Sequence, residues 1–197
     1  MYRKLNNGFY NSRQLRKFGF KSVGANVLVA KDAIVIGFEN IAIGNNVKID
    51  SNVTLAASGG TLNIGNWIHI GGSSHLSCSG GIVLKDFVTI SQGVNIYSAS
   101  DDYSGDALTN PTVAEEYKNV ERESVLVEKH VIIGSNSVVA PGTILEIGVA
   151  IGALSFAKGR LEAWNIYGGN PIQKLKARRS GLLEIEKKFK KDLGLDF

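Results

Sequence analysis

The chain has 197 residues, a length that suits one main domain with short appendages. Hydrophobic residues make up 44% and charged residues 20%, as in a globular protein, and the net charge of +4 is compatible with phosphate ligands, with nucleic acid or with a plain solvated surface. No apolar run approaches the roughly 20 residues of a membrane span, and residues 1–24 lack the continuous apolar core of a secretory signal. The lone Cys78 excludes an internal disulfide and favours a reducing compartment, so we expect a cytoplasmic location.

Residues 1–22 precede the regular part of the chain and carry six basic side chains and no acidic one. Asn11 is placed to cap a short helix that has Leu15 and Phe18 on one side. The repeat that follows predicts a solenoid, whose open end has to be covered, so we interpret residues 1–22 as an N-terminal cap. A polyanion-binding arm is the alternative.

A six-residue repeat runs from Val23 to Ile96 and resumes from Val127 to Lys158. All seventeen repeat positions hold Val, Ile or Leu, although only 53 of the 197 residues are of these types. The positions are 23, 29, 35, 43, 49, 55, 64, 70, 76, 84, 90, 96, 127, 133, 139, 145 and 151.

A fixed short period of this kind is typical of a solenoid. Side chains alternate along a strand, so each repeat residue and the residue two places before it point to the same side, which here is the inside. Three six-residue units then close one triangular coil of 20 or 21 residues, and stacked coils form parallel ladders around an aliphatic core. The repeat predicts an all-β fold in which residues 23–158 form a parallel β-helix, although spacing alone does not give its hand.

Residues 97–126 interrupt the repeat with a polar and acidic segment. An insertion of this length in a compact domain is usually functional or disordered. Its aromatic residues Tyr103 and Tyr117, together with Pro111, favour an ordered loop that projects from one corner of the prism.

Residues 159–197 form a C-terminal tail and helix. From Ser180 the apolar residues Leu182, Ile185, Phe189 and Leu193 recur at helical spacing around Glu186, and Gly194 is placed to end the helix. We expect this helix to pack against the outside of the prism.

Four features together resemble the hexapeptide-repeat acyltransferases: the repeat, the loop SDDYSG at 100–105, the run IGSNSVVAPG at 133–142 and the run WNIYGGNPIQKL at 164–175. The sequence is most similar to the sugar O-acetyltransferase branch, which includes galactoside and maltose acetyltransferases and enzymes of surface-polysaccharide synthesis. The resemblance implies a left-handed β-helix and a homotrimer with active sites in clefts between neighbouring prisms. It also implies acetyl-CoA as co-substrate, with no metal.

The expected reaction is transfer of an acetyl group to a hydroxyl or amine of a sugar, in the synthesis of a surface polysaccharide or of its nucleotide-sugar precursor, with no nucleic-acid partner. On the family pattern, the turns near Ser135, Ala153 and Lys158 hold the pantetheine chain of acetyl-CoA. The basic tail, with Lys174 and Arg178, is placed to meet the nucleotide phosphates. A solvated basic helix end is the alternative for these two side chains.

A sugar hydroxyl needs a base to take its proton, and histidine is the usual choice near neutral pH. Galactoside-type relatives carry that histidine a few residues after the position matching Ile96, where this chain has Asp101. His75 precedes an inward residue, so it points outward, and it lies one coil from Asn95. It also matches a position where such relatives carry an active-site asparagine. A His75–Asp101 pair with exchanged roles is therefore our catalytic hypothesis.

His69 also precedes an inward residue, on the neighbouring face, from where it would reach the cleft of the adjoining subunit as a further catalytic candidate. We expect Asp102, Tyr103 and Asn95 to bind the acceptor. If that acceptor is an amine, the loop carboxylates would bind its ammonium group. The plainer alternatives are surface or interface histidines and a turn cap at the two aspartates. His130 occupies a turn, and we expect it on the surface.

Two other classes of protein remain as alternatives. A γ-type carbonic anhydrase uses the same prism with a zinc ion held by three histidines, the number present here, but the His-x4-His spacing of that family is absent. A non-catalytic β-helix scaffold is favoured by the missing loop histidine. The residues leave open the acceptor sugar, the choice between oxygen and nitrogen, and the length of the acyl chain.

Overall fold

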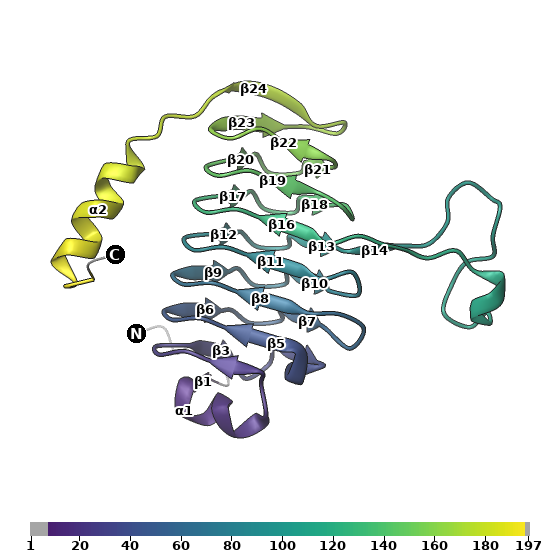
Figure 1. The fold of residues 1–197 in the computed structure, drawn as a ribbon, viewed down its shortest axis with the longest axis horizontal. Coiled ribbons are helices and arrows are strands. Elements are labelled where there is room, and N and C mark those ends of the chain that lie inside the picture. The colour runs from purple at the N-terminus through teal and green to yellow at the C-terminus, as the bar shows by residue number, and fades with distance from the viewer. Residues whose placement is uncertain (1–7, 196–197) are drawn as a thin grey trace, which may run out of the picture.

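The computed structural model describes residues 8–195. It is a triangular prism of stacked coils, with a loop projecting from one side and a helix alongside another (Figure 1). Three sheets form its faces, and we number them in the order in which the coil visits them. All their strand pairs are parallel except the two at the ends of the second face, where β1 and β24 pair antiparallel. The prediction of a left-handed parallel β-helix is confirmed.

The first face contains β2 (Ser22–Val23), β5 (Ile41–Ile43), β8 (Leu62–Ile64), β11 (Ile82–Leu84), β16 (Val125–Val127), β19 (Ile144–Leu145) and β22 (Arg160–Leu161). The second face contains β1 (Phe9–Asn11), β3 (Leu28–Ala30), β6 (Val47–Ile49), β9 (Ile68–Ile70), β12 (Thr89–Ile90), β17 (Ile132–Ile133), β20 (Ala150–Ile151), β23 (Asn165–Gly168) and β24 (Gln173–Ala177). The third face contains β4 (Ile34–Ile36), β7 (Thr54–Ala56), β10 (His75–Ser77), β13 (Asn95–Tyr97), β18 (Val138–Val139) and β21 (Phe156–Ala157).

The core is the aliphatic column that the repeat predicts. Fifteen of the seventeen repeat residues are buried, and the two exceptions, Val23 and Val35, lie in the first coil and pack against the core from its end. Burying a side chain of this size contributes roughly 1.5–3 kcal/mol. The fold therefore rests on many similar contributions between neighbouring coils, and none of them depends on the outward-facing residues.

The corner between the first and second faces requires left-handed backbone in every coil. Asn26 and Asn46 take that conformation early in the chain, with φ of 55° and 58°, as small polar residues often do. The next three coils place Trp67, Phe87 and His130 there, with φ between 53° and 64°. Bulky residues adopt this conformation only at an energetic cost, so the rings at this corner must be held by their surroundings.

The described part of the N-terminal segment packs against the first coil of the prism, and a capping role stays a prediction. Helix α1 (Ser12–Leu15) begins at Asn11, whose side chain accepts the N–H of Gln14, and buries Leu15. Phe18 is about half exposed because it lies in the separate 3-10 turn Arg16–Phe18. The Arg16 guanidinium donates to two carbonyls of the first coil, which joins the cap to the solenoid. The basic residues of the predicted arm before residue 8 lie outside the described part of the chain.

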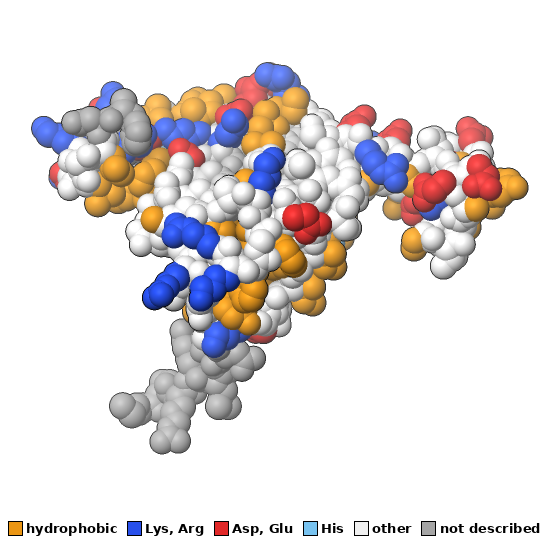
Figure 2. Space-filling view, turned by 60° about the horizontal axis from the view of Figure 1, so that its bottom comes forward, with side chains coloured by type: hydrophobic (Ala, Val, Ile, Leu, Met, Phe, Trp, Pro, Cys, Tyr) orange, Lys and Arg blue, Asp and Glu red, His pale blue; other side chains and the backbone are white. Residues whose placement is uncertain are grey.

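The inserted loop leaves the prism after β13 and returns at β16. Its base is the antiparallel pair β14 (Ala99–Ser100) and β15 (Glu121–Arg122), and it contains the 3-10 turn Glu115–Tyr117. Figure 2 shows acidic and apolar side chains together on this projection. The side chains of Tyr103 and Tyr117 are 94% and 62% exposed, so the aromatic residues that predicted an ordered loop do not pack into the prism.

The coil continues beyond residue 158, where the repeat suggested that it ends. Strands β22 and β23 add parallel pairings, with Leu161 and Tyr167 buried at inward positions. Strand β24 then folds back antiparallel on β23 and closes the prism. Helix α2 (Leu182–Asp192) ends before Gly194, whose φ is 66°, and runs down the outside of the prism (Figure 1). No helix within residues 8–195 is both long and apolar enough to cross a bilayer.

Candidate functional site

The third face carries the ladder on which the catalytic hypothesis rests. His75 and Asn95 are register partners on β10 and β13, one coil apart. The imidazole ring of His75 also contacts the ring of Tyr97, with centroids 5.8 Å apart. His75 is half-buried and Tyr97 is 37% exposed, so this face presents an imidazole, an amide and a phenol side by side.

The loop carboxylates have different surroundings. The Asp102 carboxylate accepts the backbone N–H groups of Ser104, Gly105, Asp106 and Ala107 and the hydroxyl of Ser104. The Ser104 hydroxyl and these N–H groups lower the pKa of Asp102 to about 2, so Asp102 organises the turn as an ionised acceptor. Asp101 and Tyr103 are both exposed. Within residues 8–195, no hydrogen bond joins Asp101 to His75.

The second face holds a pair that the sequence analysis missed. The Nε2 atom of His69 lies 2.7 Å from Oδ2 of Asp50, and the Nζ atom of Lys48 lies 2.8 Å from Oδ1. Burial alone would raise the pKa of Asp50, but hydrogen bonds from Lys48 and His69 outweigh it and lower the pKa. Lys48 and His69 are register partners on β6 and β9. The pairing of Lys48 with His69 could have been predicted from the sequence by counting one coil along the chain. The contact of the Asp50 side chain with His69 could not, because the two residues are not register partners.

The residues proposed to bind the donor are spread over three different corners of the prism and, for Lys174, over strand β24. Ser135 and Ala153 occupy the corner between the second and third faces in successive coils, where the Leu154 N–H donates to the Ser135 carbonyl. The exposed Lys158 lies at the corner between the third and first faces. Lys174 pairs with Glu162, Nζ to Oε2, at 3.2 Å.

Arg178 lies at the remaining corner, between the first and second faces. Its Nη1 atom donates to the carbonyls of His130, Gly148 and Val149 at 2.8, 3.0 and 3.3 Å. Through these bonds Arg178 ties the tail to the solenoid. A contact with the coenzyme phosphates therefore stays a prediction for this residue, and it would have to use other guanidinium nitrogens.

At this same corner three rings form a stack. The Trp67 and Phe87 rings lie 5.0 Å apart at an interplanar angle of 4°, and the Phe87 and His130 rings lie 5.2 Å apart at 18°. From α2, Phe189 meets Trp67 edge-on at 5.9 Å. The expectation of a surface His130 is wrong: the residue is only 7% exposed, because the helix and the stack cover it.

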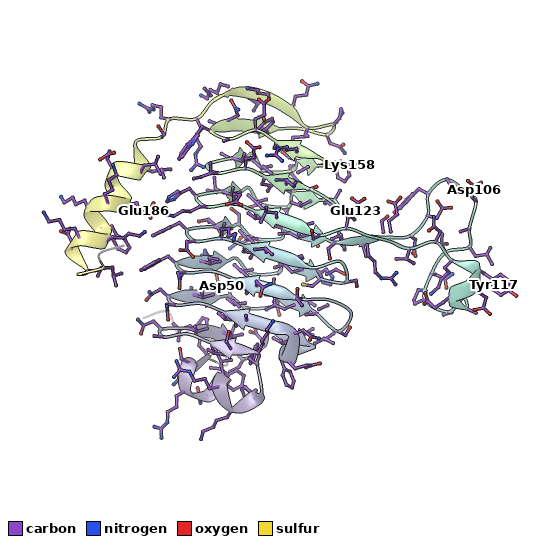
Figure 3. The ribbon with its side chains drawn as sticks, viewed as in Figure 1. Asp50, Asp106, Tyr117, Glu123, Lys158 and Glu186 are labelled. Atoms are coloured by element: carbon purple, nitrogen blue, oxygen red, sulfur yellow. The ribbon has the colours of Figure 1, made fainter. Side chains whose placement is uncertain are left out.

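Helix α2 fastens to the corner through a buried carboxylate. The two oxygens of Glu186 contact Lys129, Lys190 and His130. Figure 3 labels Glu186 between α2 and the prism. Burial would raise the pKa of Glu186, yet the hydrogen bonds from these partners lower it to about 2. The pKa of His130 is lowered, because burial and the charges of Lys129 and Arg178 together outweigh the raising effect of Glu186. A cavity of about 430 Å³ separates part of the helix from the second face, bordered by Thr89 and by the residues Trp67, Phe87, His130, Val131, Ile132, Arg178, Leu182, Ile185, Glu186 and Phe189.

The three histidines have three separate environments. His69 contacts Asp50, His75 contacts Tyr97 and His130 contacts Glu186. In the part of the chain from residue 8 to residue 195, no three side chains of His, Cys, Asp or Glu gather as metal ligands would. The carbonic anhydrase alternative therefore has no assembled ligand set within one chain.

Known proteins of similar sequence or similar structure are acyltransferases. No protein-family model matches the chain. A dTDP-4-amino-4,6-dideoxy-D-glucose acyltransferase from Escherichia coli is 43% identical over 177 residues, which are 90% of this chain and 92% of that protein. An N-acyltransferase from Bacillus cereus, solved in complex with dTDP and 3-hydroxybutyryl-CoA, is 42% identical with a TM-score of 0.91, covering 95% of this chain and 99% of that one. A hexapeptide-repeat acetyltransferase from Vibrio cholerae, solved with acetyl-CoA, shares the fold with a TM-score of 0.60 at 17% identity, covering 85% of this chain and 76% of that one.

Proposed function

This chain belongs to the hexapeptide-repeat acyltransferase family, and we propose that it moves an acyl group from an acyl-CoA to the amino group of a dTDP-linked amino sugar. The observation that carries the proposal is the similarity, over nearly the whole chain, to an N-acyltransferase that binds dTDP and an acyl-CoA. The sequence left oxygen and nitrogen open as acceptor atoms, and this similarity favours nitrogen. It also extends the donor beyond acetyl-CoA to longer acyl groups.

The chemistry requires a neutral amine close to the thioester. The amine nitrogen attacks the thioester carbonyl, a C–N bond forms, and the C–S bond breaks with the sulfur leaving as CoA thiolate. The nitrogen must lose a proton in the process, so a base within hydrogen-bond reach is needed, together with an N–H donor for the carbonyl oxygen. His75, His69 and Asp101 are the candidates for the base. Asn95, Asp102 and Tyr103 stay candidates for acceptor binding.

A homotrimer is part of the proposal, because the candidates lie on different surfaces of one prism. His75 and the base of the loop belong to the third face, and His69 belongs to the second. A cleft between two protomers would bring one protomer's third face and loop against the second face of its neighbour. Exposed apolar side chains support such packing: Ile34 is 56% exposed and Ile36 48% on the third face. Exposed apolar strips of this kind usually mark interfaces.

Asp101 gains support from the solved relatives. Structures of the Bacillus cereus protein include variants of one aspartate and of one serine ten positions before it, near the middle of that chain. In this chain only Asp32 and Asp101 have a serine ten positions before them, and Asp32 is close to the N-terminus. Because the two proteins match over nearly their whole lengths, Ser91 and Asp101 are the corresponding pair in our proposal. Ser91 follows an inward residue at the end of β12, so it adds a hydroxyl to the second face.

The cellular setting follows from the substrates. Acyl-CoA and nucleotide-linked sugars are made in the cytoplasm, where the buried thiol of Cys78 would stay reduced, so we place the enzyme there. A surface glycan is the proposed destination of the acylated sugar. A putative lipopolysaccharide O-acetyltransferase from Escherichia coli, 30% identical over 71 residues, supports that destination.

The test is a thiol-release assay with acetyl-CoA and 3-hydroxybutyryl-CoA. The acceptors are dTDP-4-amino-4,6-dideoxyglucose, its 4-hydroxy counterpart and free amino sugars. We expect release with the nucleotide-linked amine only, and light scattering should give three times the chain mass of 21.1 kDa. Asp101→Asn, His75→Ala and His69→Ala should lower kcat, whereas Lys188→Ala on the exposed side of α2 should not. Release with the hydroxyl sugar instead of the amine would overturn the proposed acceptor, and a monomer would overturn the shared cleft.

A further inference from the structure

The His69–Asp50 contact has a feature that a simple surface ion pair lacks. Each oxygen of the Asp50 carboxylate has its own partner, Lys48 on Oδ1 and His69 on Oδ2. The carboxylate is therefore held from both sides and cannot rotate away from the imidazole without losing a contact. Its lowered pKa keeps it ionised around neutral pH. Asp50 thus fixes the orientation of the His69 ring, in the way that a carboxylate hydrogen-bonded to a metal-binding histidine fixes that ring.

The contact also selects which ring nitrogen is available. Asp50 engages Nε2, and among residues 8–195 no hydrogen bond involves Nδ1 of His69. A ring nitrogen that donates to a carboxylate leaves the other nitrogen as the acceptor in the neutral imidazole. The His69 side chain is 45% exposed, compared with 25% for Asp50, so its free edge is open to a ligand while the carboxylate is sheltered.

His69 lies one strand away from a cavity that it does not itself border. Its register partner on the next strand, β12, is Thr89, which borders the cavity under α2. Ser91 directly follows β12 and is partly exposed. The charged groups that face the imidazole are Lys48 on β6 and Asp50, which directly follows β6, while β12 contributes only uncharged side chains. Lys48 is itself placed over the ring of Phe9 on β1, at 5.6 Å.

We propose that Asp50 is a positioning residue for this reaction and that His69, held by it, is the base. The inference rests on the proposed transfer to an amine. As the acceptor nitrogen attacks the thioester carbonyl, the C–S bond breaks and the CoA thiolate leaves. The proton lost by the nitrogen goes to Nδ1 of His69. Asp50 keeps its negative charge throughout and stabilises the imidazolium that forms.

The experiment compares Asp50→Asn, His69→Ala and the double variant in the full-length protein, with acyl-CoA and the dTDP-linked amino sugar. We expect kcat to fall about 10- to 100-fold in Asp50→Asn with KM nearly unchanged, which is the range for losing a carboxylate that orients a histidine. The acid limb of its pH–kcat profile should move to lower pH, because the imidazolium loses its carboxylate. The double variant should be no slower than His69→Ala, because Asp50 acts only through that ring.

A matched control is available on the first face. Glu146 contacts Arg160 at 2.6 Å and its side chain is 26% exposed, nearly as for Asp50. Glu146→Gln should leave kcat and the pH profile unchanged, and urea unfolding of every variant would detect a folding defect. Normal kcat in Asp50→Asn, a loss with an unmoved acid limb, or additive losses in the double variant would each overturn the positioning role while the proposed function stands. A wild-type protein that acylates no amino sugar would overturn both.

Discussion

His130 and Glu186 lie 56 positions apart in the chain, yet Nε2 of the imidazole lies 2.6 Å from Oε2 of the carboxylate in a site that both residues bury. This contact joins helix α2 to the corner at which the Trp67 and Phe87 rings stack. The docking of the C-terminal helix therefore depends on a buried charge network as well as on the edge-on contact of Phe189.

The pH dependence of this docking has a defined sign. The pKa of Glu186 is lowered in the folded protein to about 2. The stability that this residue contributes is therefore fully present at pH values above its pKa in the unfolded chain, and it is lost as pH falls towards 2. The pKa of His130 is also lower in the folded protein than in the unfolded chain. As pH falls through the ordinary pKa of histidine, the unfolded chain binds a proton at this residue before the folded protein does, and the folded state loses stability. Protonation of either group in acid therefore weakens the attachment of helix α2 to the prism.

Glu186→Gln should therefore lower the free energy of unfolding at pH 7 by about 1–3 kcal/mol, the cost of leaving buried partners unsatisfied. It should also flatten the loss of stability between pH 4.5 and 2 relative to the wild type. Urea titrations followed by tryptophan fluorescence would measure both, since Trp67 contacts Phe189 of the helix. Equal pH slopes in the two proteins would contradict this account.

A ladder of side-chain amides at the same corner should contribute to the free energy of unfolding. The side-chain Oδ1 of Asn66 accepts from the backbone N–H and the side-chain Nδ2 of Asn45, and its own Nδ2 donates to Oδ1 of Asp86. Asn66→Ala breaks these links in two directions and should cost about 1–3 kcal/mol in urea unfolding. Asn63→Ala removes an outward amide of the same coil that takes no part in the ladder, and it should cost less than about 0.5 kcal/mol. Similar costs for both would argue against the ladder.

The projecting loop should be dispensable for folding and necessary for activity. Every hydrogen bond of the segment 101–120 stays within the loop and its β14–β15 base, and Lys118 pairs with Glu115 inside it. Replacing residues 102–119 by a short Gly-Ser turn should change the free energy of unfolding by less than about 1 kcal/mol, because loop length affects closure entropy only weakly. The thiol-release assay should lose its signal. A truncated protein that retains full activity would show that the loop takes no part in the cleft.

The single thiol should be unreactive in the native protein. Cys78 has no exposed surface, and burial raises the pKa of its thiol to about 12. Only the thiolate reacts readily, so Ellman's reagent at pH 8 should titrate no thiol in the native protein and one per chain in urea. Rapid titration without denaturant would mean that the third-face coil around Cys78 opens.

The inward and outward sides of the solenoid could be predicted residue by residue. His69 and His75 were placed outward because Ile70 and Leu76 follow them at repeat positions, and both repeat residues are fully buried. The end of the coil was harder to locate, because Tyr167 stands at a position where the repeat calls for an aliphatic residue. Its ring is buried while its hydroxyl accepts the Glu162 N–H, so a residue that looks polar in the sequence completes the last coil.

What the sequence by itself determined is therefore the prism and the direction of each side chain, since both follow from a period of six and from alternation along short strands, which are local properties. Only the tertiary structure decided which outward groups meet. Asp50 reaches His69 across one coil, and Glu186 reaches His130 from a helix that packs on the corner between the first and second faces. These meetings depend on coil stacking and on where the tail crosses the prism, and neither leaves a periodic trace in the chain.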